Sequence, residues 1–120
     1  MHKQRAQTVV EFALLAPVMI LLVLGILGVG RAFYTYVDLT SAARAGARYA
    51  IAQPATTCDT AGTQTQVKNS QLDLTWPAGV VITLTCPTDR RVVTITNYPF
   101  DTFTPGIGQI TLATSATLPF

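Results

Sequence analysis

The stretch that decides the fold is FALLAPVMILLVLGILGVG, residues 12–30, which contains no charged residue. A helix rises about 1.5 Å per residue, so this run would extend about 28 Å and match the hydrocarbon core of a bilayer. It is longer than the apolar region of a usual secretory signal peptide, although Lys3 and Arg5 precede it as they would in a signal. We therefore expect a retained transmembrane helix, with a removed signal peptide as the alternative.

The flanking residues indicate how the span is oriented. His2, Lys3 and Arg5 precede the apolar run, so the positive-inside rule places the N-terminus in the cytoplasm. The two cysteines, Cys58 and Cys86, both follow the run. An even number outside the membrane favours one disulfide in an oxidising compartment, and two unrelated buried thiols are the alternative.

The apolar helix is expected to continue beyond the membrane. RAFYTYVDLTSAARAGARYAIA, residues 31–52, has no proline, and its apolar positions recur close to the 3.6-residue helical period. The membrane helix therefore extends outward as one amphipathic rod. Pro54 ends it, because proline lacks the amide that a helix needs and disfavours a helical residue before it.

Two stripes of side chains run along the surface of this rod. Ala42, Gly46 and Ala50 are spaced four residues apart, which allows another helix or sheet to approach closely. Arg44 and Arg48 form a parallel cationic stripe. The rod either covers its own domain and leaves a solvated cationic edge, or it contacts a partner.

The remaining chain changes character twice. Residues 54–70 are rich in Thr and Gln and are predicted to form a long loop pinned by Cys58. Four β-branched segments with a period of two then predict short antiparallel strands. They are LDLTW at 72–76, VVITLTC at 80–86, RRVVTITNY at 90–98 and IGQITLATSATL at 107–118. The expected fold is α+β: one long N-terminal helix followed by a small antiparallel sheet.

The composition argues against catalysis and nucleic-acid binding. The single histidine, His2, lies at the N-terminus, so the outer domain cannot build a Ser/His/Asp or Cys/His pair. The formal charge of +2 comes from Lys3 and Arg5, with no basic cluster elsewhere. We expect no enzyme, metal, cofactor, small-molecule substrate or nucleic acid. The aspartates, which show no metal-ligand spacing, are Asp38, Asp59, Asp73, Asp89 and Asp101.

Two residues within the apolar region need an explanation. Glu11, the only glutamate, lies about one turn inside the cytoplasmic edge, where an ionised carboxylate is costly. Its side chain either reaches the headgroups or pairs with a cation, such as an α-amine freed by cleavage before Gln7. Pro17 removes the hydrogen bond to the carbonyl of Ala13 and is expected to kink the helix.

The sequence RAQTVVEFALLAPVMILLVLGILGVGRAFYTYVDLTSAARAGARYA, residues 5–50, resembles the N-terminal half of TadE-like proteins, the pseudopilins of tight-adherence (Tad/Flp) type IV pilus systems. VTITNYPFDTFTPGIGQITLATSAT, residues 93–117, resembles their C-terminal strands. The resemblance implies a type IV pilin-like fold and a prepilin that a membrane prepilin peptidase cleaves between Ala6 and Gln7. In an assembled pilus, Glu11 would then pair with the α-amine of Gln7 in a neighbouring subunit.

The resemblance divides the chain into four parts. Residues 1–6 are the leader, 7–30 the transmembrane and assembly helix, 31–53 its extracytoplasmic extension, and 54–120 the loop and antiparallel sheet. It implies a minor pseudopilin in the bacterial cytoplasmic membrane, or in the extracellular pilus, that supports adhesion and biofilm formation. The implied partners are other pilin or pseudopilin subunits, the prepilin peptidase and the membrane.

Two other functions stay open. The chain could be the main filament subunit, although the resemblance favours a minor one because main Tad subunits have little outer domain. It could also be a single-span anchor for an extracellular binding module. That module would bind its ligand through Trp76, Tyr98, Phe100 and Phe103, unless these aromatic residues pack in the core and turns.

Overall fold

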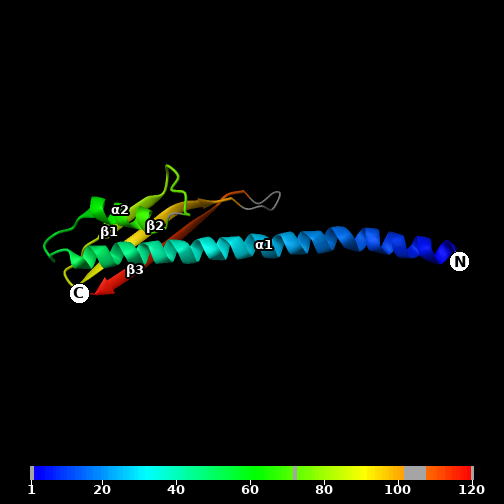
Figure 1. Cartoon of the computed structure of the whole chain (residues 1–120), viewed down its shortest axis with the longest axis horizontal. Coiled ribbons are helices and arrows are strands. Elements are labelled where there is room, and N and C mark those ends of the chain that lie inside the picture. Colours follow the sequence, from blue (N-terminus) through cyan, green and yellow to red (C-terminus); the bar gives the residue numbers. More distant parts are fainter. Residues whose placement is uncertain (1, 72, 102–107, 120) are drawn as a thin grey trace.

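The computed structural model describes residues 2–71, 73–101 and 108–119, with side chains from residue 7 onward. One long helix, α1 (His2–Ala52), carries a small domain at its C-terminal half (Figure 1). The domain contains α2 (Thr60–Ser70) and the strands β1 (Val81–Thr85), β2 (Arg90–Phe100) and β3 (Ile110–Pro119). The molecule measures 84 × 25 × 22 Å, so α1 sets its length. The α+β prediction is confirmed.

The helix α1 runs unbroken for 51 residues. Pro17 lies inside this helix, and the helix continues beyond it. A kink at Pro17 therefore stays a prediction. The helix ends at Ala52, two residues before Pro54, as the sequence predicts.

The prediction of a loop over residues 54–70 is wrong in its second half, where α2 forms. Asp59 caps this helix: its Oδ1 atom accepts a hydrogen bond of 2.9 Å from the backbone N–H of Gly62. Only Thr63 and Val67 are buried in α2. With a single apolar residue on its buried face, α2 has too weak a periodicity to be recognised from hydropathy.

The strands form one antiparallel sheet in the order β1-β2-β3, so β2 is central. The predicted fourth strand, at 72–76, is wrong for its described residues, which lie outside the sheet, while Leu72 is outside the described residues. The backbone turns there, with the N–H of Leu74 donating to the carbonyl of Gln71 at 3.4 Å, and Pro77 follows. Leu74 and Trp76 still pack against the core, which explains their alternating apolar pattern.

A bulge in β2 redirects its C-terminal side chains. The register with β3 shifts between Ile95 and Tyr98, and Asn97 has a φ of 59°. Asparagine tolerates this left-handed conformation better than most residues. Because of the shift, Tyr98 and Phe100 face the same side as Val93 and are buried.

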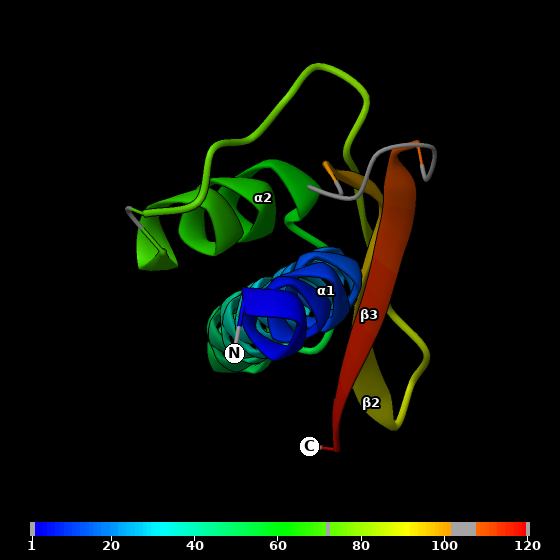
Figure 2. The same cartoon turned by 90° about the vertical axis from the view of Figure 1, so that its right-hand side faces the viewer.

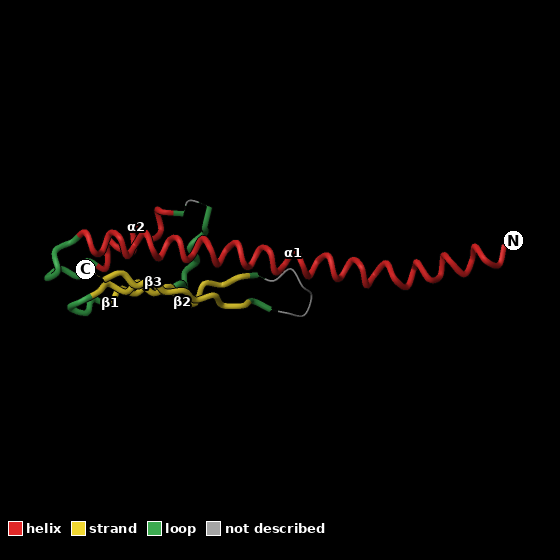
Figure 3. The backbone as a smooth tube through the Cα atoms, turned by 90° about the horizontal axis from the view of Figure 1, so that it is seen from below, coloured by secondary structure: helices red, strands yellow, loops and turns green. Residues whose placement is uncertain are grey.

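The helix α1 lies between α2 and the sheet (Figure 2). Figure 3 shows the sheet running along the C-terminal half of α1 while the N-terminal half projects alone. Among the described side chains of α1, the first buried one is Leu39. The core cluster combines them with one residue of α2 and several of the sheet: Leu39, Ala42, Ala43, Ala47, Val67, Ile82, Val93, Ile95, Tyr98 and Ala116.

Candidate membrane and assembly site

The N-terminal half of α1 exposes a continuous apolar surface. Phe12 and Leu14 are each 71% exposed, and Val29 is 73% exposed. The most apolar 18-residue segment of Gln7–Ala52 has a mean hydropathy of 2.8, and none of this segment is buried. By its length and composition this helix could cross a membrane. An exposed apolar surface of this size marks contact with lipid or with another protein.

Glu11 lies exposed within this surface. Among the described residues, no hydrogen bond or ion pair reaches its carboxylate. Gln7 lies four positions earlier, on the same helical face, and is also exposed. Any cation that pairs with Glu11 therefore lies outside the described side chains. Cleavage between Ala6 and Gln7 stays a prediction.

The stripe of small residues packs within the chain. Ala42 is 0% and Ala50 is 3% exposed, and Gly46 is also buried. A Cβ atom at Gly46 would collide with Cγ2 of Val67 in α2. The stripe thus allows α2 to approach α1 closely, and covering its own domain is the interpretation that the structure supports.

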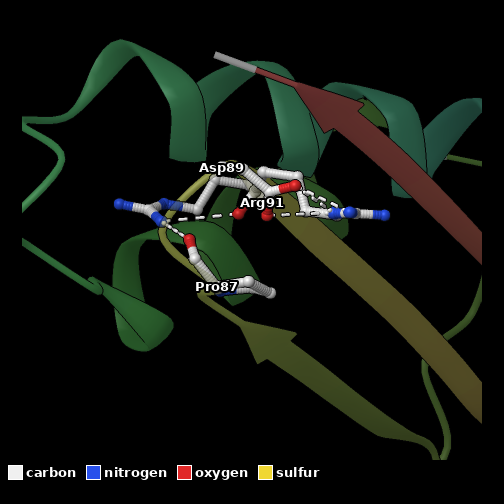
Figure 4. A network of polar contacts seen from close by, with 4 residues as sticks. Pro87, Asp89 and Arg91 are labelled. Atoms are coloured by element: carbon white, nitrogen blue, oxygen red, sulfur yellow. Dashed lines mark hydrogen bonds and ion pairs between the residues drawn. The ribbon is translucent and has the colours of Figure 1, made fainter.

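A covalent link and a polar link hold the loop after α1 against the sheet. Cys58 and Cys86 form a disulfide with a Cα–Cα distance of 6.2 Å, which confirms the predicted pair. Nearby, Arg91 is only 1% exposed. Its Nη2 donates to the carbonyl of Ala55 at 2.7 Å. Its Nη1 donates to the carbonyl of Pro87 at 3.0 Å, as Figure 4 shows. Both links tie the segment that follows α1 to the region between the end of β1 and the start of β2.

Sequence reasoning placed Arg91 in the strand predicted at 90–98 but gave it no role, because arginine is usually a surface residue. The alternation along β2 was the available signal: Arg91 shares a face with Val93 and Ile95, which are both fully buried. A cation on that face must bond to backbone carbonyls or to acids. It is a structural residue of the domain.

A third link joins α1 to the start of α2. The hydroxyl of Tyr49 donates to Oδ2 of Asp59 at 3.1 Å. This hydrogen bond to a carboxylate raises the pKa of Tyr49 above its usual value. Asp59 therefore caps α2 with one oxygen and ties it to α1 with the other.

The aromatic residues of the alternative binding module pack inward. Trp76 and Tyr98 form an edge-to-face pair with ring centroids 6.1 Å apart. The hydroxyl of Tyr98 donates to the carbonyl of Thr75 at 3.0 Å, and Phe100 is only 9% exposed. Phe103 lies outside the described residues. The described members of this set thus serve core packing.

The fold and its surfaces define a small, disulfide-linked α+β domain on a helix that could anchor it in a membrane. Residues 6–48 match the sequence model of the TadE-like protein family, which confirms the resemblance over this segment. No curated protein and no solved structure gives a significant match. The matched segment contains Gln7, Glu11 and Pro17, whereas the disulfide and the sheet lie outside it.

Proposed function

We propose that the chain is a minor pseudopilin, a structural subunit in the biogenesis of a Tad/Flp-type pilus that supports adhesion and biofilm formation. The observation that carries the proposal is that the family match and the uncovered apolar surface lie on the same helix. The family match over residues 6–48 includes the whole apolar half of α1 that the domain leaves uncovered. A subunit that acts by assembly needs such an uncovered helix, because its partners must cover it.

In this proposal the chain is made as a prepilin. The prepilin peptidase cleaves between Ala6 and Gln7 on the cytoplasmic face, removing the basic leader MHKQRA. The mature chain stays in the cytoplasmic membrane, with its domain on the extracytoplasmic side, until it joins other pilin or pseudopilin subunits. It binds no substrate or cofactor and performs no chemistry.

Glu11 then has a role in assembly. The freed α-amine of Gln7 has a reference pKa near 8 and is mostly protonated at neutral pH. When helices of neighbouring subunits pack side by side, the exposed carboxylate of Glu11 meets this amine away from water. Each charge offsets the desolvation of the other, and a lone charge in the same place would be strongly unfavourable.

The experiment that tests the proposal is the intact mass and N-terminal sequence of the protein recovered from native membranes. We expect a chain that begins at Gln7 and carries the intact disulfide. A chain that retains Met1 would contradict processing and favour the anchored binding module. A chain that begins beyond Gly30 would show that the apolar run is a secretion signal.

A further inference from the structure

The two edges of the sheet differ in how they are protected. β1 has five residues, and α2 reaches its edge, where Nε2 of Gln64 donates to the carbonyl of Ile82 at 2.9 Å. β3 has ten residues, none of them charged, and among the described residues β2 is its only neighbour in the sheet. Native proteins usually shorten, charge or cover such an edge, because its free backbone groups pair with other chains. Within the described part of the chain, the edge of β3 is neither short nor charged, and no further strand or helix covers it.

The strand register identifies the free groups. Pro119 is paired with Arg90 but has no N–H, so this pair is not hydrogen-bonded. Bonded and non-bonded pairs alternate, which places Ser115 and Thr117 in the non-bonded set, with their N–H and C=O groups pointing away from β2. The same alternation carried to β1 turns the carbonyl of Ile82 outward, and this is the carbonyl that Gln64 bonds.

Two arginines of α1 lie beside this edge. Arg44 and Arg48 line a groove of about 250 Å³ together with residues 115–118 of β3. Oγ1 of Thr40 lies 3.1 Å from Oγ1 of Thr114, which holds α1 and β3 in register at one end of the groove. Both arginines are exposed, and neither has a hydrogen bond or ion pair within the described part of the chain.

The spacing of the arginines matches that of a strand. Residues four apart on a helix are separated by about 6 Å along its axis. Alternate residues of a strand, which point to the same side, are separated by about 6.6–6.8 Å. A strand added to β3 would therefore present side chains i and i+2 to Arg44 and Arg48, and opposite charge favours carboxylates there.

We propose that the edge of β3 binds an extended acidic segment of a partner protein. The segment pairs with the backbone of Ser115 and Thr117 and directs two carboxylates, at positions i and i+2, to Arg44 and Arg48. A second copy of this chain fits less well, because its β3 has no charge and its own arginines would add repulsion. This interface is separate from Glu11 and does not depend on the proposed pilus role.

The test uses the full chain in detergent micelles and fluorescent ten-residue peptides of alternating Val and Thr. One peptide carries glutamates at i and i+2, the second carries them at i and i+1, and the third carries lysines at i and i+2. Fluorescence anisotropy should show the first peptide binding at least about ten-fold more tightly than the others, since only it matches both arginines. Equal binding of the three peptides would overturn the proposal.

Matched variants test the backbone hydrogen bonds and the charge pairs separately. Ser115→Pro or Thr117→Pro removes an outward N–H that β2 does not use and should abolish binding, with circular dichroism reporting the fold. The double variant Arg44→Glu/Arg48→Glu should reverse the preference toward the lysine peptide, whereas Lys68→Glu on α2 should change nothing. Unaltered binding by the folded proline variants would overturn the proposal. Disulfide cross-linking of Ser115→Cys between two copies would also overturn it, because the occupant would be a second copy.

Discussion

The two halves of α1 form one unbroken helix but have opposite surroundings. In the N-terminal half, Phe12 and Leu14 are each 71% exposed. In the C-terminal half, Leu39, Ala42 and Ala47 are all 0% exposed. Apolar character is present in both halves, so hydropathy alone does not decide which half the domain covers. The half that the domain covers is decided by the size of the side chains and by how close each half lies, along the chain, to α2 and the strands.

Small residues are the physical reason for the difference. Gly46 lets Val67 of α2 approach to a distance that no Cβ would allow. Around Gly25, by contrast, a Cβ would meet nothing within 4 Å. The N-terminal half instead exposes many large apolar side chains, which suit contact with lipid tails. The comparison predicts that identical substitutions in the two halves have different effects.

The largest expected effect follows from changing Glu11, the only glutamate of the chain, which lies in the uncovered half. Glu11→Gln keeps the shape of the side chain, favours membrane insertion, and leaves the α-amine of a neighbouring subunit without its partner. We expect incorporation into the pilus fraction to fall at least about ten-fold, while the amount in the membrane stays the same. Quantitative immunoblotting of sheared pili and membranes measures this, with Val10→Ala as the matched control. Full incorporation of Glu11→Gln would sink the assembly role of Glu11.

The next effect compares one substitution in both halves. Leu39→Ala should lower the free energy of unfolding of the domain by about 3 kcal/mol, because Leu39 is fully buried and its truncation leaves a cavity. Leu21→Ala should leave that free energy unchanged, because Leu21 is 62% exposed. Denaturant unfolding in detergent, followed by the fluorescence of Trp76, measures both. Equal losses would mean that the two halves unfold as one unit.

The smallest effect concerns the glycines. Gly46→Ala should destabilise the domain by about 1–2 kcal/mol, because the new methyl group overlaps the buried side chain of Val67, which has little rotamer freedom. Gly25→Ala places the same methyl group in open space and should not change the unfolding of the domain. The same fluorescence measurement applies. A neutral Gly46→Ala would show that α2 moves away from α1 without cost.

Much of the fold could be predicted because its signals are local. The apolar run, its helical continuation, the stop at Pro54 and three strands all follow from periodicity and turn chemistry. The helix α2 was missed, although Asp59 was a local signal for its N-terminal cap. The burial of α2 depends on contacts with α1, which is distant in sequence. The strand prediction at 72–76 is wrong for a similar reason. Trp76 fits the alternating apolar pattern of a strand and packs against Tyr98, but its backbone does not pair with the sheet.

The sequence by itself determined the uncovered helix, the position of Glu11 within it and the availability of two cysteines, because composition and order along the chain are sufficient for these. Only the tertiary structure decided that α2 covers the small-residue stripe, that Arg91 bonds the carbonyls of Ala55 and Pro87, and that β3 keeps an open edge beside Arg44. Each of these features joins residues far apart in sequence. Their contacts exist only once the chain has packed, when burial and strand register select which groups are paired and which stay free.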